Sequence, residues 1–217
     1  MPRLNVARFH AQRSFAAARI ALLGAGALLT AACAITTPET HYYVLSPRAL
    51  ESKEEPAPIS VGFEGVQLSQ LYAQEAIAYR ESPYRIEFYH YHQWATAPEL
   101  MVADAILKLL ADSGRFQRVD TAPGPTSFDL VVRGQLREIY EDGREEPWKA
   151  VLTVAWEIRD GKTDALLANL TTSEQAPAEK HSSEAIVGAM SRAAEATAER
   201  LAEAIVQAAA KRPRPAS

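Results

Sequence analysis

The chain has 217 residues and a single cysteine, Cys33. With no second cysteine, an internal disulfide is excluded, even in a compartment that would permit one. A zinc site built from several cysteines is excluded for the same reason. The roughly 185 residues from Cys33 onward suit a single domain that can bury its own hydrophobic core.

The sequence also lacks the motifs of several common enzyme classes. It contains no G-x-S-x-G, H-E-x-x-H or P-loop pattern. Glu141, Asp142, Glu145 and Glu146 surround one turn, and a solvated charged loop accounts for all four. We therefore predict a protein that is not an enzyme and has no catalytic residues.

A metal site is not expected either. His90 and His92 lie two residues apart, so on a strand they would share one face. No third ligand is evident, since His41 and His181 are distant in sequence, and zinc sites use three or four protein ligands. Two solvated histidines at a strand end are the better interpretation, and no metal or other cofactor is predicted.

Long apolar runs are missing. The longest, from Ile20 to Ile35, has 16 residues and is preceded by Arg19, whereas a membrane-spanning helix needs about 20. Four arginines and no acidic residues precede or border this run. A basic start, a short apolar region and small residues before a cleavage point are typical of a signal peptide, which we assign to residues 1–32.

The four residues that end at Cys33, TAAC at 30–33, resemble a bacterial lipobox. This resemblance implies that Cys33 becomes the lipidated N-terminus, carrying fatty acyl chains such as palmitate, with residues 33–40 as a tether. The covalent lipid would be the only attached group. The alternative is an ordinary signal cleavage nearby that leaves a free thiol. The residue after the cysteine is Ala34, whereas an aspartate there would favour retention in the inner membrane. The resemblance therefore implies that the protein is anchored in the inner leaflet of the outer membrane and faces the periplasm.

Positive charge is scarce in the remainder. Removing residues 1–32 leaves 19 basic and 27 acidic side chains, a formal charge of −8. Nucleic-acid binding calls for a basic patch, so this charge argues against a nucleic-acid partner.

Alternation and turn residues predict short strands along the chain. The expected strands cover residues 41–45, 59–66, 77–80, 85–91, 116–120, 128–137, 148–159 and 165–173. The 160–161 Asp-Gly pair predicts a tight hairpin turn. Trp148 and Trp156 fall in phase with an apolar sheet face and are predicted to be core residues.

Two helices are predicted. Thr96 and Glu99 form a capping box for the first, which would bury a stripe beginning at Leu100 and end at Ser113-Gly114. Ser183 is the expected N-cap of the second, whose apolar stripe consists of Ile186, Met190, Ala194, Leu201 and Ile205, with Thr197 as a polar member. The predicted fold is an α+β, two-layer domain over residues 41–210, with a mostly antiparallel sheet of roughly seven strands, both helices on one face, and a disordered tail at 211–217.

Several segments in order point to a family. "HYYVLSP" follows the lipobox, then "ISVGFEGVQLSQLY", then "IAYRESPYRIEFYHYHQWATAPEL". This arrangement resembles the ABC-type transport auxiliary lipoproteins, which include that of the paraquat-inducible system. The family's usual Tyr-Leu order is reversed in Leu71-Tyr72, and its arginine before tryptophan is Gln93.

The resemblance implies a docking or scaffold subunit of an MCE-type ABC system that moves lipids between the inner and outer membranes. Its partners would be a periplasmic MCE-family protein and an inner-membrane permease and ATPase, and homo-oligomer formation is left open. The motif region suggests Leu71, Tyr72, Arg80 and Trp94 for the partner-binding surface, although packing at the helix start is the preferred role of Trp94.

Two other functions remain open from the sequence. One is an outer-membrane assembly lipoprotein that partners a β-barrel machine, which would be distinguished by the protein that co-purifies. The other is a periplasmic hydrolase, which would require a cleft with convergent titratable groups.

Overall fold

The computed structural model describes residues 38–50, 55–122 and 128–212. The chain divides into two units, Met1–Glu39 and Thr40–Ser217, and the second contains all the helices and strands of the described residues. Its strands are β1 (His41–Tyr43), β2 (Ala57–Leu68), β3 (Ala76–Ser82), β4 (Arg85–Trp94), β5 (Phe116–Thr121), β6 (Leu130–Asp142), β7 (Lys149–Asp160) and β8 (Leu166–Pro177). The helices are η2 (Gln70–Tyr72, a 3₁₀ turn), α2 (Pro98–Asp112) and α3 (Ser183–Ala209).

The strands form one sheet that forks at β6. On one side β6 pairs along its length with β7, which in turn pairs with β8, and both pairings are antiparallel. On the other side its first half pairs with β2 and its last two residues pair with β3, both in parallel. One branch therefore continues as β2–β5 and the other as β3–β4–β1.

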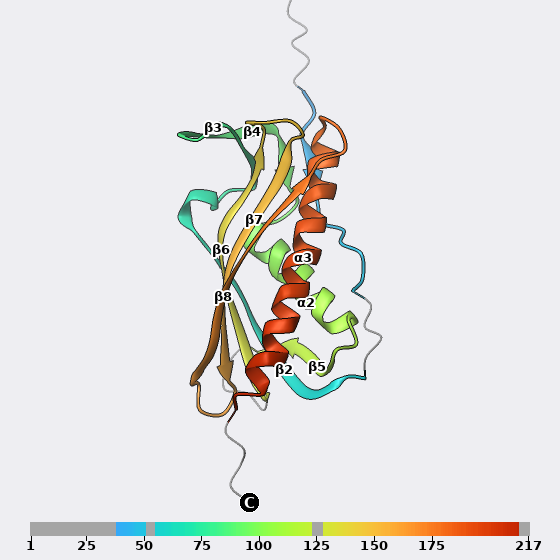
Figure 1. The fold of residues 1–217 in the computed structure, drawn as a ribbon. Coiled ribbons are helices and arrows are strands. Elements are labelled where there is room, and N and C mark those ends of the chain that lie inside the picture. The colour runs from blue at the N-terminus through green and yellow to red at the C-terminus, as the bar shows by residue number, and fades with distance from the viewer. Residues whose placement is uncertain (1–37, 51–54, 123–127, 213–217) are drawn as a thin grey trace, which may run out of the picture. The chain divides into compact units, whose positions relative to one another are not determined.

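Both long helices cover the same face of the sheet, and α2 also packs against α3 (Figure 1). The longest ladders are antiparallel and the β2–β5, β2–β6 and β1–β4 pairings are parallel. The prediction of an α+β, two-layer domain with a mostly antiparallel sheet is confirmed, and each of the eight strands overlaps one of the strand segments expected from the sequence.

Helix α3 begins where a serine can cap it. The N-cap is Ser182, whose hydroxyl accepts a hydrogen bond from the Ala185 backbone N–H at 3.2 Å, so the predicted cap Ser183 is the first helical residue. The predicted stripe is confirmed as fully buried. Small residues such as Ala194 and Ala198, both with no exposed surface, line the same face. Their small volume lets the helix axis lie close to the sheet.

Helix α2 differs from its prediction at both its cap and its buried face. Its N-cap is Ala97, without a side-chain cap, because Pro98 takes the first helical position that proline favours. The Thr96 capping box is therefore absent. Leu100 is 55% exposed, and the face toward the core consists of Met101, Val102, Ala105, Ile106, Leu109 and Leu110. Apolar residues occupy so much of this helix that their spacing alone does not determine its orientation.

Two predictions near the sheet ends are also wrong. Trp148 is half-buried and stacks on the exposed ring of His181, with centroids 4.2 Å apart. It is therefore not part of the core, unlike Trp156, which is 1% exposed. The Asp-Gly pair at 160–161 does not form a two-residue turn, since β8 begins only at Leu166 and the positive φ of 56° occurs at Asp164.

The centre of the sheet is packed around Trp156. Its ring lies 6.1 Å from that of Phe63, and its indole N–H donates to the Thr172 hydroxyl at 3.1 Å. Directly across the ladder is Gly134. A Cβ at Gly134 would lie 2.6 Å from the Trp156 ring and 2.9 Å from the Val66 side chain. The space that a side chain would need there is already filled by the indole.

We expect Gly134→Ala to lower the free energy of unfolding by about 1–3 kcal/mol, the usual cost of overpacking a core. The matched control is Gly188→Ala, because a Cβ there meets only an arginine nitrogen at 3.9 Å within α3. That change is expected to stabilise the protein by about 0.5–1 kcal/mol. Urea unfolding of the two variants measures both effects, and equal stability of the two would contradict this packing.

Candidate functional site

The sheet face opposite the helices carries a shallow hollow. It has a volume of about 750 Å³ and is formed by β2, β6, β7 and β8. The side chains around it are mostly polar: Glu64, Gln67, Arg133, Gln135, Arg137, Glu157, Asn169 and Thr171. Strand alternation explains this composition, since the residues between them face the helices.

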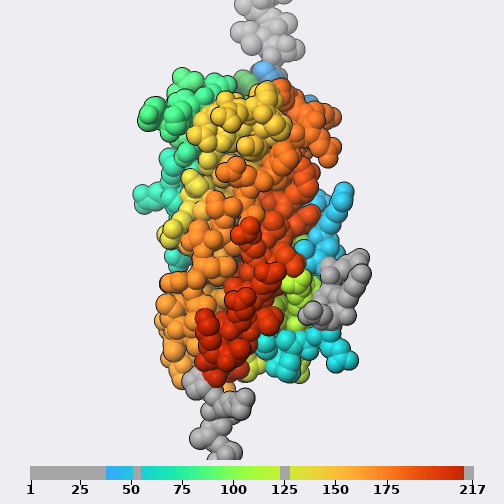
Figure 2. Space-filling model, viewed as in Figure 1, coloured from blue at the N-terminus to red at the C-terminus, as the bar shows by residue number. Residues whose placement is uncertain are grey.

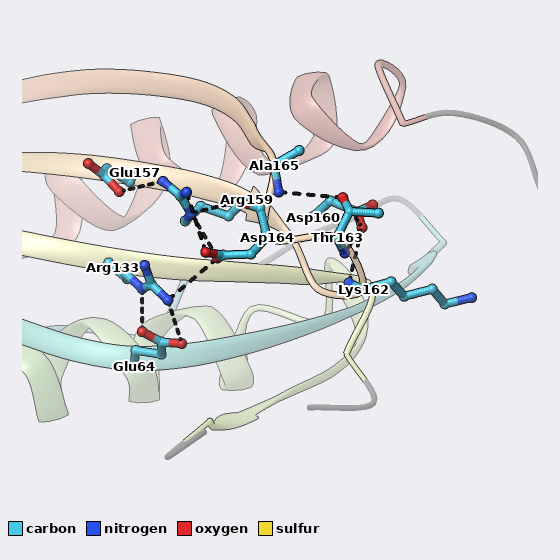
Figure 3. Close-up of polar contacts among 9 residues, drawn as sticks. All are labelled: Glu64, Arg133, Glu157, Arg159, Asp160, Lys162, Thr163, Asp164 and Ala165. Carbon is cyan, nitrogen blue, oxygen red and sulfur yellow. Dashed lines mark hydrogen bonds and ion pairs between the residues drawn. The ribbon is translucent and has the colours of Figure 1, made fainter. Parts of the chain in front are cut away.

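An ion-pair network crosses one end of this hollow (Figure 3). The Arg133 guanidinium pairs with both carboxylate oxygens of Glu64 and lies 3.5 Å from the Asp164 carboxylate. The Arg159 guanidinium lies 2.8 Å from Asp164 and 3.0 Å from Glu157. Hydrogen bonding to Glu64 raises the pKa of Arg133, and bonding to Asp164 raises that of Arg159. Three carboxylates face two guanidiniums, so most of the charge is paired and the network keeps a formal charge of −1.

The β7–β8 turn beside this network is organised by a carboxylate. Asp160 accepts hydrogen bonds from the backbone N–H groups of Lys162 and Thr163 at 3.0 and 2.9 Å. These bonds lower the pKa of Asp160 to about 2, and the bond from the Thr163 backbone N–H has the largest effect. Arg212 donates to Asp160 at 3.1 Å and to Asp129 at 2.8 Å. Arg212, which was predicted to belong to a disordered tail at 211–217, therefore contacts the domain. Residues 213–217 lie outside the described residues.

The η2 turn lies on the same uncovered side of the sheet (Figure 1). Tyr72 is 2% exposed, and its hydroxyl accepts a bond from the Arg80 guanidinium at 3.4 Å. Arg80 in turn lies over the Tyr140 ring, 4.4 Å from its centroid. Burial raises the pKa values of both tyrosines. Leu71, the neighbour of this anchored tyrosine, is 49% exposed.

Comparison with known proteins identifies the family. The family described as "ABC-type transport auxiliary lipoprotein component" matches residues 43–202. The chain belongs to this family. It is an auxiliary lipoprotein of an ABC-type transport system, as the segment order predicted.

Solved structures agree on the fold. A protein from Xanthomonas campestris superimposes with a TM-score of 0.71 at 16% identity, covering 79% of this auxiliary lipoprotein and 98% of that chain. An uncharacterized protein superimposes with a TM-score of 0.63 at 13% identity, covering 77% and 99%. The comparison with curated proteins finds no match.

The four predicted partner-binding residues of the auxiliary lipoprotein differ in accessibility. Leu71 is exposed and Arg80 is partly exposed, whereas Tyr72 and Trp94 show only 2% and 1% of their surface. A side chain that is this buried cannot itself contact a partner. Trp94 belongs to the core, which agrees with a packing role, and Tyr72 holds the η2 turn in place. The prediction of partner contact therefore rests on Leu71 and Arg80.

Sequence reasoning missed a buried carboxylate. Glu141, predicted to be solvated, is 3% exposed. The Tyr89 hydroxyl donates to its two oxygens at 3.1 and 3.2 Å. Burial raises the pKa of Glu141, and the Tyr89 bond partly opposes this; burial also raises the pKa of Tyr89. Alternation counted from Leu130 would place Glu141 on the polar face; the bulge between Leu136 and Glu138 shifts the phase and turns Glu141 to the covered face, and no local sequence signal marks that shift.

The histidines do not converge on a metal. His92 Nδ1 lies 2.8 Å from the Tyr43 hydroxyl, and its ring stacks on His41 at 5.6 Å, while His90 is exposed. No group of three or more metal-ligating side chains occurs within residues 38–50, 55–122 and 128–212. In the same ranges no helix is both long and apolar enough to cross a membrane. Cys33 lies outside the described residues, so its lipidation stays a prediction.

Glu141 should make stability depend on pH. Because its folded-state pKa is raised, the folded protein binds the proton more tightly than the unfolded chain. Stability is then greatest below the unfolded pKa and falls as the pH rises through the folded pKa. We expect Glu141→Gln to remove this loss, so that the stability of the variant relative to the wild type rises between pH 4 and pH 7.

Tyr89→Phe provides the matched comparison. Loss of the donated hydrogen bond raises the Glu141 pKa further, so the total loss of stability with rising pH should be larger than in the wild type and extend to higher pH, with each additional pKa unit contributing about 1.4 kcal/mol. Urea unfolding at several pH values measures these losses. Identical losses in all three proteins would show that Glu141 is not held as a buried carboxyl group.

Proposed function

We propose that this auxiliary lipoprotein is the lipid-anchored, periplasm-facing docking subunit of an MCE-type ABC system that moves lipids between the inner and outer membranes. Cys33 would carry the lipid in the inner leaflet of the outer membrane. The partners would be a periplasmic MCE-family protein and, through it, the inner-membrane permease and ATPase. Family membership supports the transport role.

The observation that carries the docking role is the uncovered sheet face. Its helices lie on the other side, and the η2 turn, which the buried Tyr72 holds, carries an exposed leucine. Gln67 lines the hollow and Leu71 follows four residues later. An apolar side chain on a rigid support, next to polar groups, suits the centre and rim of a protein interface.

We further propose that the subunit has no catalytic role and no cofactor beyond the covalent lipid. The charged groups at one end of the hollow pair with each other (Figure 3). A paired guanidinium is less available to polarise a substrate. The energy for transport would come from the ATPase of the partner complex.

We expect Leu71→Asp to weaken co-purification with the MCE protein at least tenfold, because a charge would replace the apolar contact at the interface centre. Leu100→Asp is the matched control, since Leu100 has similar exposure, 55% against 49%, but lies on α2. Quantitative pull-down compares the variants, with circular dichroism as the check on folding. Equal losses from both, or from neither, would remove Leu71 from the docking surface.

Cys33→Ala tests the anchor. The variant is expected to leave the outer-membrane fraction and become soluble, because no acyl chains remain to bury in the bilayer. Membrane fractionation of tagged proteins, combined with cross-linking, measures both location and partner. Unchanged fractionation would contradict lipidation at Cys33, and recovery of a β-barrel in place of an MCE protein would favour the assembly-lipoprotein function.

A further inference from the structure

Exposed tyrosines occur at both ends of one arm of the forked sheet. Tyr42, Tyr84 and Tyr91 are 64%, 97% and 40% exposed. They belong to β1, to the turn between β3 and β4, and to β4. In the described residues no tyrosine outside this arm is comparably exposed. Because a large aromatic surface in water is unfavourable, three exposed tyrosines spread along one arm call for an explanation.

The β3–β4 hairpin holds Tyr84 away from the rest of the domain. Figure 2 shows the hairpin, in green, as a projection at one edge of the surface. Tyr84 sits in its turn, where its backbone N–H donates to the Ser82 hydroxyl at 3.2 Å. Tyr79 and Tyr89 stack within the hairpin with centroids 4.5 Å apart. The tip is therefore presented by an ordered support.

The arm is also rigidly joined to the point where the N-terminal tether enters. β1 begins at His41 and pairs in parallel with β4, His41 opposite His92. Directly after β1, the backbone N–H groups of Ser46 and Arg48 donate to α3 side chains at 3.0 and 2.7 Å. The entering chain is thus fixed on both sides, and the tyrosines move with it.

The tether is short. From Cys33 to His41 there are eight residue steps, which span at most about 28 Å when fully extended. If acyl chains on Cys33 are buried in a bilayer, the start of β1 must stay within this distance of the membrane surface. This step rests on the proposed function, since it requires the lipid anchor.

The charges of the hairpin favour a particular lipid surface. Arg85 pairs with Glu81 at 3.4 Å and with Glu87 at 3.0 Å. No excess of positive charge is left on the hairpin to attract anionic lipids. A tyrosine ring has an apolar body and a polar hydroxyl, the combination that is enriched at the headgroup level of membranes.

We propose that Tyr42, Tyr84 and Tyr91 form a second membrane contact, in which the arm rests in the headgroup region of a zwitterionic phospholipid bilayer. The lipid anchor sets the distance and the tyrosines set the orientation. The uncovered sheet face would then be held at a defined angle to the membrane, available to a partner from the periplasm.

The test uses the full lipidated protein in phosphatidylcholine vesicles. Because Cys33 carries the lipid, Pro83→Cys supplies the single free thiol beside Tyr84, and it is labelled with an environment-sensitive fluorophore. Lys162→Cys, in the β7–β8 turn at the opposite end of the domain (Figure 1), is the matched control. We expect quenching by headgroup-region spin-labelled lipids at residue 83 to exceed that at residue 162 at least threefold, with little dependence on salt.

Removal of the tyrosines provides the second part of the test. In Pro83→Cys combined with Tyr42→Ser, Tyr84→Ser and Tyr91→Ser, quenching at residue 83 should fall to the level at residue 162, with circular dichroism confirming the fold. In the proteins that keep all three tyrosines, equal quenching at residues 83 and 162 would overturn the proposal. A change in the signal at residue 83 that occurs only when an MCE protein is added would also overturn it. Flotation of the same samples separates the two failures: protein that floats without quenching retains its anchor, whereas protein that does not float has lost the proposed function as well.

Discussion

Close packing of α3 on one face of the sheet is the constraint on which the rest of the structure depends. The helix presents alanines and a few larger apolar residues to β6–β8, and Trp156 fills the space that Gly134 leaves open. This arrangement buries the face under the helices and leaves much of the other face exposed to water. The exposed face can then carry polar groups without cost to the core, so the same constraint that stabilises the domain also creates its free surface.

The fork at β6 divides that surface into parts with different supports. The strand pairs with β2 first and with β3 only at its final residues. The bulge near Leu136 and Glu138 changes which residues face the helices. After the bulge, Glu141 faces inward and Tyr140 faces outward beneath Arg80. A local irregularity thus produces both the buried carboxyl group and the support for the η2 turn.

Much of the fold was predictable because period-two alternation and the α3 stripe are strong local signals. The failures have physical causes that lie outside local sequence. Leu100 is exposed because the sheet selects one side of a helix in which 11 of the 15 residues are uncharged. The 160–161 pair forms a wider turn because the Asp160 carboxylate binds the following backbone N–H groups. Of the candidate site, Leu71 could be proposed from its motif, whereas the burial of Tyr72 and the hollow itself depend on how distant strands meet.

An anchored subunit that binds a partner has to control its orientation as well as its location. A lipid at the end of a tether limits only distance, and a domain free to rotate would present its proposed docking face in any direction. Orientation requires a second contact, away from the docking face but rigidly connected to it. Here β3 joins β6 at Tyr79 and Arg80, and Arg80 also holds Tyr72. The same strand therefore connects the tyrosine-bearing arm with the η2 turn, so a contact at the arm determines where Leu71 points.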